Sequence, residues 1–151
     1  MILKNEISQK SLVWKVPPVT VDKDYVLGHF LSAFLAIPQH NESLLFKGGT
    51  ALRKCYFPGY RFSEDLDFTS LDPEYKLTTS TLNQIKKRIE QEIGILLHFQ
   101  KIVPLKYENK LTGYQTKIKY WGANHAKNQE PPIPSRWTSS IKIEITLYEL
   151  S

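Results

Sequence analysis

The sequence predicts an α+β domain in which helices pack on a mixed β-sheet. Apolar residues recur at helical spacing between residues 78 and 94, and apolar and polar residues alternate strictly between residues 141 and 148. Helical and strand-like segments follow one another in a mixed order, which favours this class. The chain has 151 residues, of which 41% are hydrophobic and 23% charged, so we expect a single domain spanning residues 1–151.

The first predicted helix follows a proline-containing stretch. Residues 16–19 read Val-Pro-Pro-Val, and we expect extended, non-helical backbone there because proline restricts its own conformation and that of the preceding residue. Thr20 or Asp22 can cap the helix that follows, whose apolar residues recur three or four positions apart. Pro38 marks the end of this helix.

Two short strands are predicted next. Residues 44–46, Leu-Leu-Phe, are typical of a short buried strand, and they run into a turn at residues 47–50 and a helical start at residues 51–54. Residues 61–69 alternate in polarity, which predicts a strand that begins near Asp65.

Residues 78–94 give the clearest helical pattern. Ser80 is the expected N-cap and Gly94 the expected stop. The apolar stripe of this helix consists of Leu82, Ile85, Ile89 and Ile93.

The C-terminal third predicts three strands and one long loop. Residues 95–103 and 113–120 are typical of strands, and residues 121–139 of a proline-containing loop. In the second of these strands, one face carries Tyr114, Thr116, Ile118 and Tyr120.

The strand at residues 141–148 has one apolar and one polar face. Its apolar row consists of Ile141, Ile143, Ile145 and Leu147. Because no helix is predicted after this strand, we expect the apolar row to be exposed, and the chain to self-associate or to need a partner.

Three carboxylates form the first candidate site. Asp65 and Asp67 are two residues apart, so on a strand both side chains lie on one face and can reach one metal-sized volume. Aspartate is disfavoured in strands, so two aspartates on one strand face indicate a functional reason. For an isolated Asp-x-Asp, however, a solvated edge or turn is the common explanation. Glu144 can add a third carboxylate, and alone it is an ordinary solvent-facing residue. Together the three form the hard oxygen cluster that Mg²⁺ prefers, as one ion or two.

The second candidate site is the glycine pair Gly48-Gly49 between a predicted strand and a predicted helix. Glycines let the backbone approach a ligand closely, and free N–H groups at the start of a helix suit phosphate. Alone, such a pair is more often a simple turn.

These motifs resemble a known family in their order and spacing. Residues 47–52, Lys-Gly-Gly-Thr-Ala-Leu, and residues 61–68, Arg-Phe-Ser-Glu-Asp-Leu-Asp-Phe, resemble the signature of the AbiEii-type nucleotidyltransferases, within the DNA-polymerase-β-like superfamily. Residues 141–145 resemble the strand that supplies that family's third carboxylate. The resemblance implies a nucleotidyltransferase-type sheet with helices packed on it, in a chain that lacks the C-terminal helical part of the family.

The resemblance also implies an activity and its residues. The expected reaction is Mg²⁺-dependent transfer of a nucleoside monophosphate from a nucleoside triphosphate to an acceptor hydroxyl, on an RNA or tRNA end or on a protein. The chain is expected to act as a toxin in an abortive-infection or toxin–antitoxin system. The catalytic and metal-binding residues would be Asp65, Asp67 and Glu144. The nucleotide-binding residues would be Lys47, Gly48, Gly49, Thr50, Arg61 and Ser63.

Two other functions fit parts of this pattern. A remnant domain that binds nucleotide or nucleic acid without turnover, and that needs a partner chain, fits the missing C-terminal part. A glycosyltransferase also uses Asp-x-Asp to hold a metal–diphosphate, but the upstream Gly-Gly turn argues against it.

Composition bounds the partners and the compartment. No apolar run approaches the ~18 residues of a membrane helix, no signal peptide is visible, and the single Cys55 cannot form an internal disulfide. We therefore expect a cytoplasmic chain without membrane contact. The family resemblance implies an antitoxin as protein partner, and the missing C-terminal part implies a completing chain. The net charge of +5 and the interleaved basic and aromatic residues 117–121 are compatible with a nucleic-acid strand. An ordinary solvated strand is the more common explanation of such a stretch.

Overall fold

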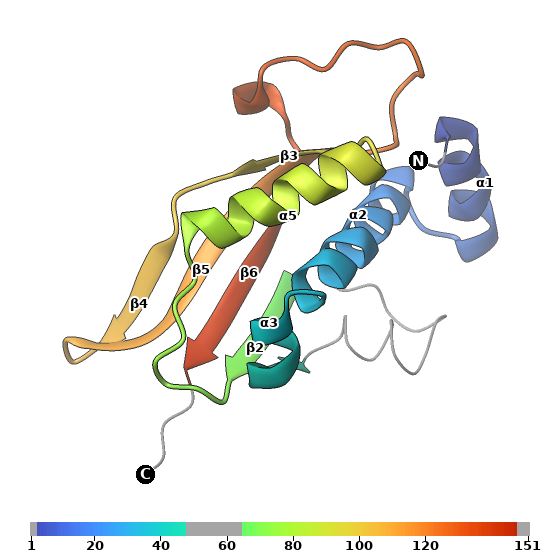
Figure 1. The fold of residues 1–151 in the computed structure, drawn as a ribbon. Coiled ribbons are helices and arrows are strands. Elements are labelled where there is room, and N and C mark those ends of the chain that lie inside the picture. The colour runs from blue at the N-terminus through green and yellow to red at the C-terminus, as the bar shows by residue number, and fades with distance from the viewer. Residues whose placement is uncertain (1–2, 48–64, 148–151) are drawn as a thin grey trace.

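A computed structural model describes residues 3–47 and 65–147 of the chain, drawn in Figure 1. The helices in these residues are α1 (Lys4–Trp14), α2 (Pro18–Leu35), α3 (Pro38–Ser43), α5 (Thr79–Glu92) and the short 3₁₀ helix η1 (Pro134–Arg136). The strands are β1 (Leu44–Lys47), β2 (Asp65–Ser70), β3 (Leu96–Phe99), β4 (Val103–Tyr107), β5 (Lys110–Trp121) and β6 (Ser140–Leu147). None of the described helices is long and apolar enough to cross a bilayer.

All the strands in the described residues belong to one mixed sheet, which confirms the predicted α+β class. The strand order is β1-β2-β6-β5-β3, and β4 also pairs with β5. Strands β2 and β6 pair in parallel, whereas the other neighbouring strands pair antiparallel. The parallel pair places two segments that are far apart in sequence at the centre of the sheet.

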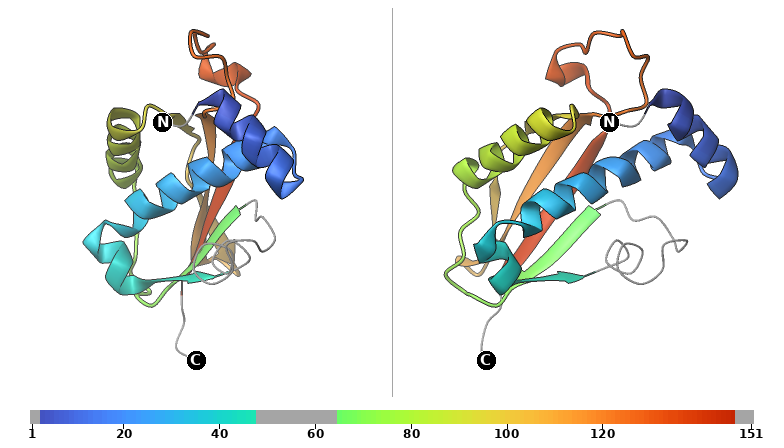
Figure 2. Two further views of the ribbon diagram at one scale, coloured as in Figure 1. Left: turned by 90° about the vertical axis from the view of Figure 1, so that its right-hand side faces the viewer. Right: turned by 45° about the vertical axis from the view of Figure 1, so that its right-hand side comes forward.

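Helices α2 and α5 lie on the same face of the sheet, as Figure 2 shows. Their apolar side chains form one core with the inward-facing residues of the strands. The apolar row of β6 is part of that core: Ile141, Ile143, Ile145 and Leu147 are all buried. The expectation that this row is exposed is therefore wrong, because helices that precede the strand in sequence cover it.

The N-terminal helices differ from the sequence prediction in two ways. Helix α2 begins at Pro18, where extended backbone is predicted, because proline is well tolerated in the first turn of a helix, whose amides have no partner within the helix. Helix α1 is not predicted at all. It buries a single residue, Ile7, and an apolar stripe is the pattern on which helix prediction rests.

Helix α5 confirms the prediction for residues 78–94 but not its cap. The hydroxyl of Thr78, not of Ser80, accepts a hydrogen bond from the backbone N–H of Thr81 at 3.2 Å. Gly94 has a φ of 84°, the left-handed conformation expected at a helix stop.

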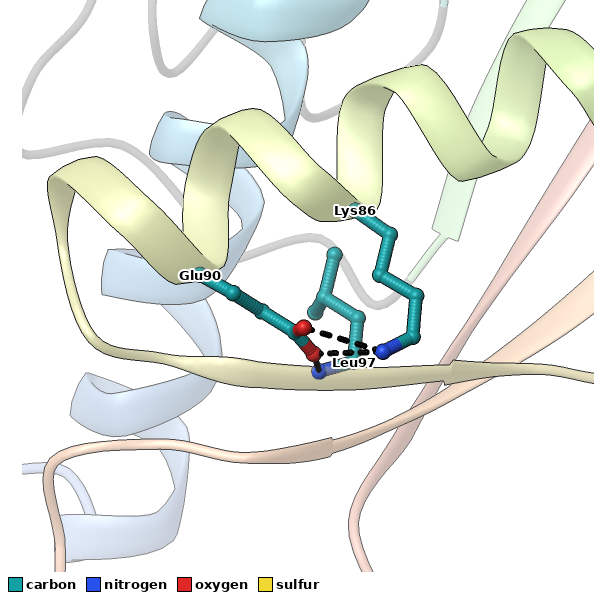
Figure 3. Close-up of polar contacts among 3 residues, drawn as sticks. All are labelled: Lys86, Glu90 and Leu97. Atoms are coloured by element: carbon teal, nitrogen blue, oxygen red, sulfur yellow. Dashed lines mark hydrogen bonds and ion pairs between the residues drawn. The ribbon is translucent and has the colours of Figure 1, made fainter.

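The carboxylate of Glu90 holds the helix to the sheet. It accepts hydrogen bonds from Lys86 Nζ and from the backbone N–H of Leu97 on β3 (Figure 3).

The predicted strand at residues 95–103 is divided into β3 and the start of β4. Both pair with β5, which at twelve residues is long enough to bind β3 along one half and β4 along the other. Between the two strands, the N–H of Gln100 donates to the carbonyl of Lys117.

Candidate functional site

The three predicted carboxylates lie on adjacent strands at the centre of the sheet. In the parallel pairing of β2 with β6, Asp67 is the register partner of Glu144, and Asp65 that of Lys142. The intervening Leu66 and Ile143 are fully buried beneath the helices, whereas the carboxylate residues are half-buried. Because side chains alternate along a strand, the carboxylates lie on the opposite face of the sheet from α2 and α5. This face is called the carboxylate face below.

The register sets the backbone spacing of the three residues. Neighbouring strands lie about 4.8 Å apart and residues two apart on one strand about 6.7 Å apart. The N–H of Lys142 donates to Asp65 Oδ1 at 3.2 Å, which ties the side chain of Asp65 to β6. In residues 3–47 and 65–147, neither Asp67 nor Glu144 has a hydrogen bond or an ion pair through its carboxylate.

The donor chemistry of this group suits Mg²⁺. All three side chains offer carboxylate oxygens, the ligands that a hard divalent cation selects. Within the described residues, no three His, Cys, Asp or Glu side chains are drawn together closely enough to hold a metal ion. Asp65, Asp67 and Glu144 thus share one sheet face on adjacent strands, but their side chains would have to move closer together to bind a cation.

Of the predicted nucleotide-binding residues, only Lys47 belongs to the described part of the chain. Lys47 is the last residue of β1 and the register partner of Asp67, so the chain leaves the sheet beside the carboxylates. The other five predicted nucleotide-binding residues lie outside the described residues: they are Gly48, Gly49, Thr50, Arg61 and Ser63.

A cluster of three lysines lies on the same face, and sequence reasoning identified only the two that are on β5. Lys117 on β5 is the antiparallel register partner of Lys142 on β6, and Lys119 lies two residues further along β5. We call Lys117, Lys119 and Lys142 the lysine cluster. The two-residue spacing of Lys117 and Lys119 already places both on one strand face, but only the register of β5 with β6 adds Lys142, which no pattern in the sequence could have shown.

One of the two aromatic residues interleaved with these lysines, Tyr120, lies on the other face of the sheet. Tyr120 is on the helix-covered face and only 3% exposed, and Trp121 stacks on His125 with ring centroids 3.4 Å apart. The interpretation of residues 117–121 as a mixed basic and aromatic surface is therefore wrong for Tyr120, because alternate strand residues face opposite ways.

Comparison with known proteins supports one family. The sequence model of the nucleotidyl transferase AbiEii toxin of Type IV toxin–antitoxin systems matches residues 29–150. A solved structure of a candidate nucleotidyltransferase from H. pylori is 25% identical, with a TM-score of 0.47 over 80% of this chain. The match covers 44% of that protein's chain. A comparison with curated proteins gives no match.

The family match spans most of the chain and contains every motif described above. It includes the strand with Asp65 and Asp67 and the strand with Glu144, which the sheet places side by side. The chain belongs to the AbiEii family of nucleotidyl transferase toxins.

Proposed function

We propose that this chain is a Mg²⁺-dependent nucleotidyltransferase that moves a nucleoside monophosphate from a nucleoside triphosphate to an acceptor hydroxyl, and that it acts as a toxin. The register pairing of Asp67 with Glu144, with Asp65 two residues earlier on the same strand face, is the observation that carries the proposal. Three carboxylates on one sheet face repel one another, and a bound Mg²⁺ would offset that repulsion directly, in addition to Lys142 opposite Asp65.

Each carboxylate has a proposed role. Asp65 and Asp67 would hold Mg²⁺, as one ion or two, and the cation would neutralise the phosphates and orient them for in-line displacement. Glu144 would either complete the metal shell or act as the general base that accepts the proton of the acceptor hydroxyl. The half-buried position of all three limits their exposure to water without closing the site to substrate.

The triphosphate would lie against the end of β1. Lys47 would offset its charge, and the backbone N–H groups of Gly48, Gly49 and Thr50 would hold its oxygens. Arg61 and Ser63 would add phosphate contacts. The acceptor would be an RNA or tRNA end or a protein, the regulatory partner an antitoxin or a completing chain, and the compartment the cytoplasm.

Label transfer tests this proposal directly. The purified chain is incubated with Mg²⁺, each α-labelled nucleoside triphosphate in turn, and either a tRNA pool or a protein extract. We expect transfer of label with at least one triphosphate, and its loss when the Mg²⁺ is chelated. Binding of triphosphate without transfer to any acceptor would contradict the proposal and favour a non-catalytic binding domain.

The substitution Glu144→Gln separates the two roles of that residue. If Glu144 is a general base, Mg–nucleotide affinity is retained and transfer is lost. If it is a metal ligand, both decrease. Equilibrium binding of a fluorescent nucleotide, measured with and without Mg²⁺, distinguishes these results. Full activity of the variant would remove Glu144 from the site.

A further inference from the structure

The lysine cluster is unusual because two of its members oppose each other directly. Lys117 and Lys142 are register partners across the antiparallel pair of β5 and β6. Cβ atoms at such positions lie about 5 Å apart, and like charges placed there destabilise a sheet. Lys119 extends the positive charge along β5, where its own register partner on β3 is His98. The direct opposition of Lys117 and Lys142 is therefore unfavourable in itself, although Asp65 and Glu144 lie beside Lys142 on the same face.

No ion pair in the described residues includes a lysine of this cluster. The ion pairs there, Lys86–Glu90 and Arg88–Glu92, both lie on α5. Lys117 is exposed and the other two are half-buried. Lys119 Nζ reaches only the carbonyl of Ser135, at 3.5 Å. The ammonium groups are thus available to an external anion.

The position of the cluster relative to the carboxylates indicates which anion it would bind. Lys142 and Glu144 are two residues apart on β6, about 6.7 Å, a reach that one extended nucleotide can span. If Lys142 and Lys117 hold phosphates of a nucleic-acid strand, the end of that nucleic-acid strand would lie beside Asp67 and Glu144. The charge also runs across β6 and β5 toward β3, as expected of a surface that follows a repeating backbone.

We propose that Lys117, Lys119 and Lys142 bind the phosphate backbone of a single-stranded nucleic acid and direct its terminal hydroxyl toward the carboxylates. This inference rests on the proposed function, and it selects nucleic acid rather than protein as the acceptor. The contacts are to phosphate, so the cluster binds strands of different sequence with similar affinity.

Salt-dependent binding of a labelled single-stranded RNA to the full chain tests this inference. Fluorescence anisotropy gives the slope of log K against log salt for the wild type, for K117Q, K119Q and K142Q, and for K117Q/K142Q. Each single substitution should weaken binding to unrelated sequences alike and reduce the slope by about 0.7, the contribution of one phosphate contact to a single strand. Thermal unfolding should show no loss of stability in K117Q/K142Q, because the substitution removes a like-charge pair.

The matched control is K87Q, an exposed lysine on α5 and thus on the other side of the sheet, which should bind RNA as the wild type does. Unchanged slopes in the cluster variants, or an equal loss in K87Q, would overturn the inference. Displacement of the RNA by polyglutamate at an equal concentration of charge would also overturn it, in favour of an acidic peptide. Asp67→Asn should retain RNA binding. If the wild-type chain binds RNA through the cluster but transfers no nucleotide, that result contradicts only the proposed function.

Discussion

His40 shows how one buried polar residue joins three segments near the end of the sheet. Its ring is 1% exposed and stacks on Phe34 with centroids 4.0 Å apart. Nδ1 lies 2.8 Å from the carbonyl of Phe34 and Nε2 lies 2.7 Å from the hydroxyl of Tyr75. A carbonyl can only accept, so the proton is on Nδ1 and the tyrosine hydroxyl donates to Nε2. The neutral imidazole satisfies both partners.

This arrangement makes stability depend on pH. Burial lowers the pKa of His40 below its ordinary value of 6.5. Because the folded protein binds the proton less readily than the unfolded chain, its stability is complete above about pH 6.5 and decreases as the pH falls toward the lowered pKa. Urea unfolding at about pH 7 and about pH 5.5 should show this loss in the wild type and in H98Q, whose histidine is exposed, but less of it in H40Q. Equal pH dependence in H40Q and the wild type would contradict the assignment.

Gly122 is required by its contact with a buried carboxylate. A Cβ added at Gly122 would lie 2.5 Å from both carboxylate oxygens of Asp22 on α2, and Asp22 Oδ1 accepts a hydrogen bond from the N–H of Ala123 at 2.7 Å. Gly122→Ala should therefore lower the free energy of unfolding by about 1–3 kcal/mol, the usual effect of overpacking. Chemical denaturation measures this change. Ala126→Ser, at an exposed position of the same loop, should change it by less than ~0.5 kcal/mol. An equally small effect at Gly122 would show that the loop adjusts freely.

At the scale of elements, the attachment of α5 to β3 depends on Glu90. Its side chain is 24% exposed and accepts hydrogen bonds from Lys86 and from the N–H of Leu97, whereas the side chain of Glu92 is 60% exposed and pairs with Arg88 at 3.4 Å. Glu90→Ala should lower the free energy of unfolding by about 1–2 kcal/mol, because it removes the charged acceptor of the N–H of Leu97, a buried residue. Glu92→Ala serves as the matched control and should cost less than ~0.5 kcal/mol. Equal effects of the two substitutions, measured by urea unfolding, would mean that the contact to β3 adds nothing.

The elements also show what the sequence could predict. Strand β6 and helix α5 are predictable because each has one uninterrupted apolar face at the correct period, from Ile141 to Leu147 and from Leu82 to Ile89. Helix α1 is not predictable in this way, because it buries only Ile7. The covering of β6 by α2 and α5 could not be foreseen either, since periodicity shows that a face is buried but not which element covers it.

The candidate site, too, could be predicted from the sequence only in part. The Asp-x-Asp spacing predicts that Asp65 and Asp67 share a strand face, and family resemblance predicts that Glu144 joins them. The parallel pairing of β2 with β6 confirms that the two strands are adjacent. The opposition of Lys117 and Lys142 depends on the register of two antiparallel strands, which no local pattern specifies.

At the scale of the whole molecule, stability and the proposed chemistry reside on opposite faces of one sheet. Helices α2 and α5 cover one face of the sheet (Figures 1 and 2), and the core lies between them and the strands. The strand register and alternation place the carboxylates and the lysine cluster on the other face. Substitutions on the carboxylate face should therefore alter activity with little effect on stability, and substitutions of core residues should do the reverse.

Nucleotide transfer by Asp65→Asn and Asp67→Asn tests the central claim most directly. Each substitution keeps the shape of the side chain and removes one negative charge from the proposed metal site. We expect each to abolish Mg²⁺-dependent transfer of label, and the double variant to be no worse than either, because the two residues act as a unit. Their unfolding free energies should stay within ~0.5 kcal/mol of the wild type.

The matched control is Asp72→Asn, which should remain fully active. Asp72 lies at an exposed turn, where its Oδ1 accepts a hydrogen bond from the N–H of Glu74, and asparagine preserves that bond. Wild-type transfer by Asp67→Asn, or loss of folding in both site variants, would contradict a metal-dependent active site on this face.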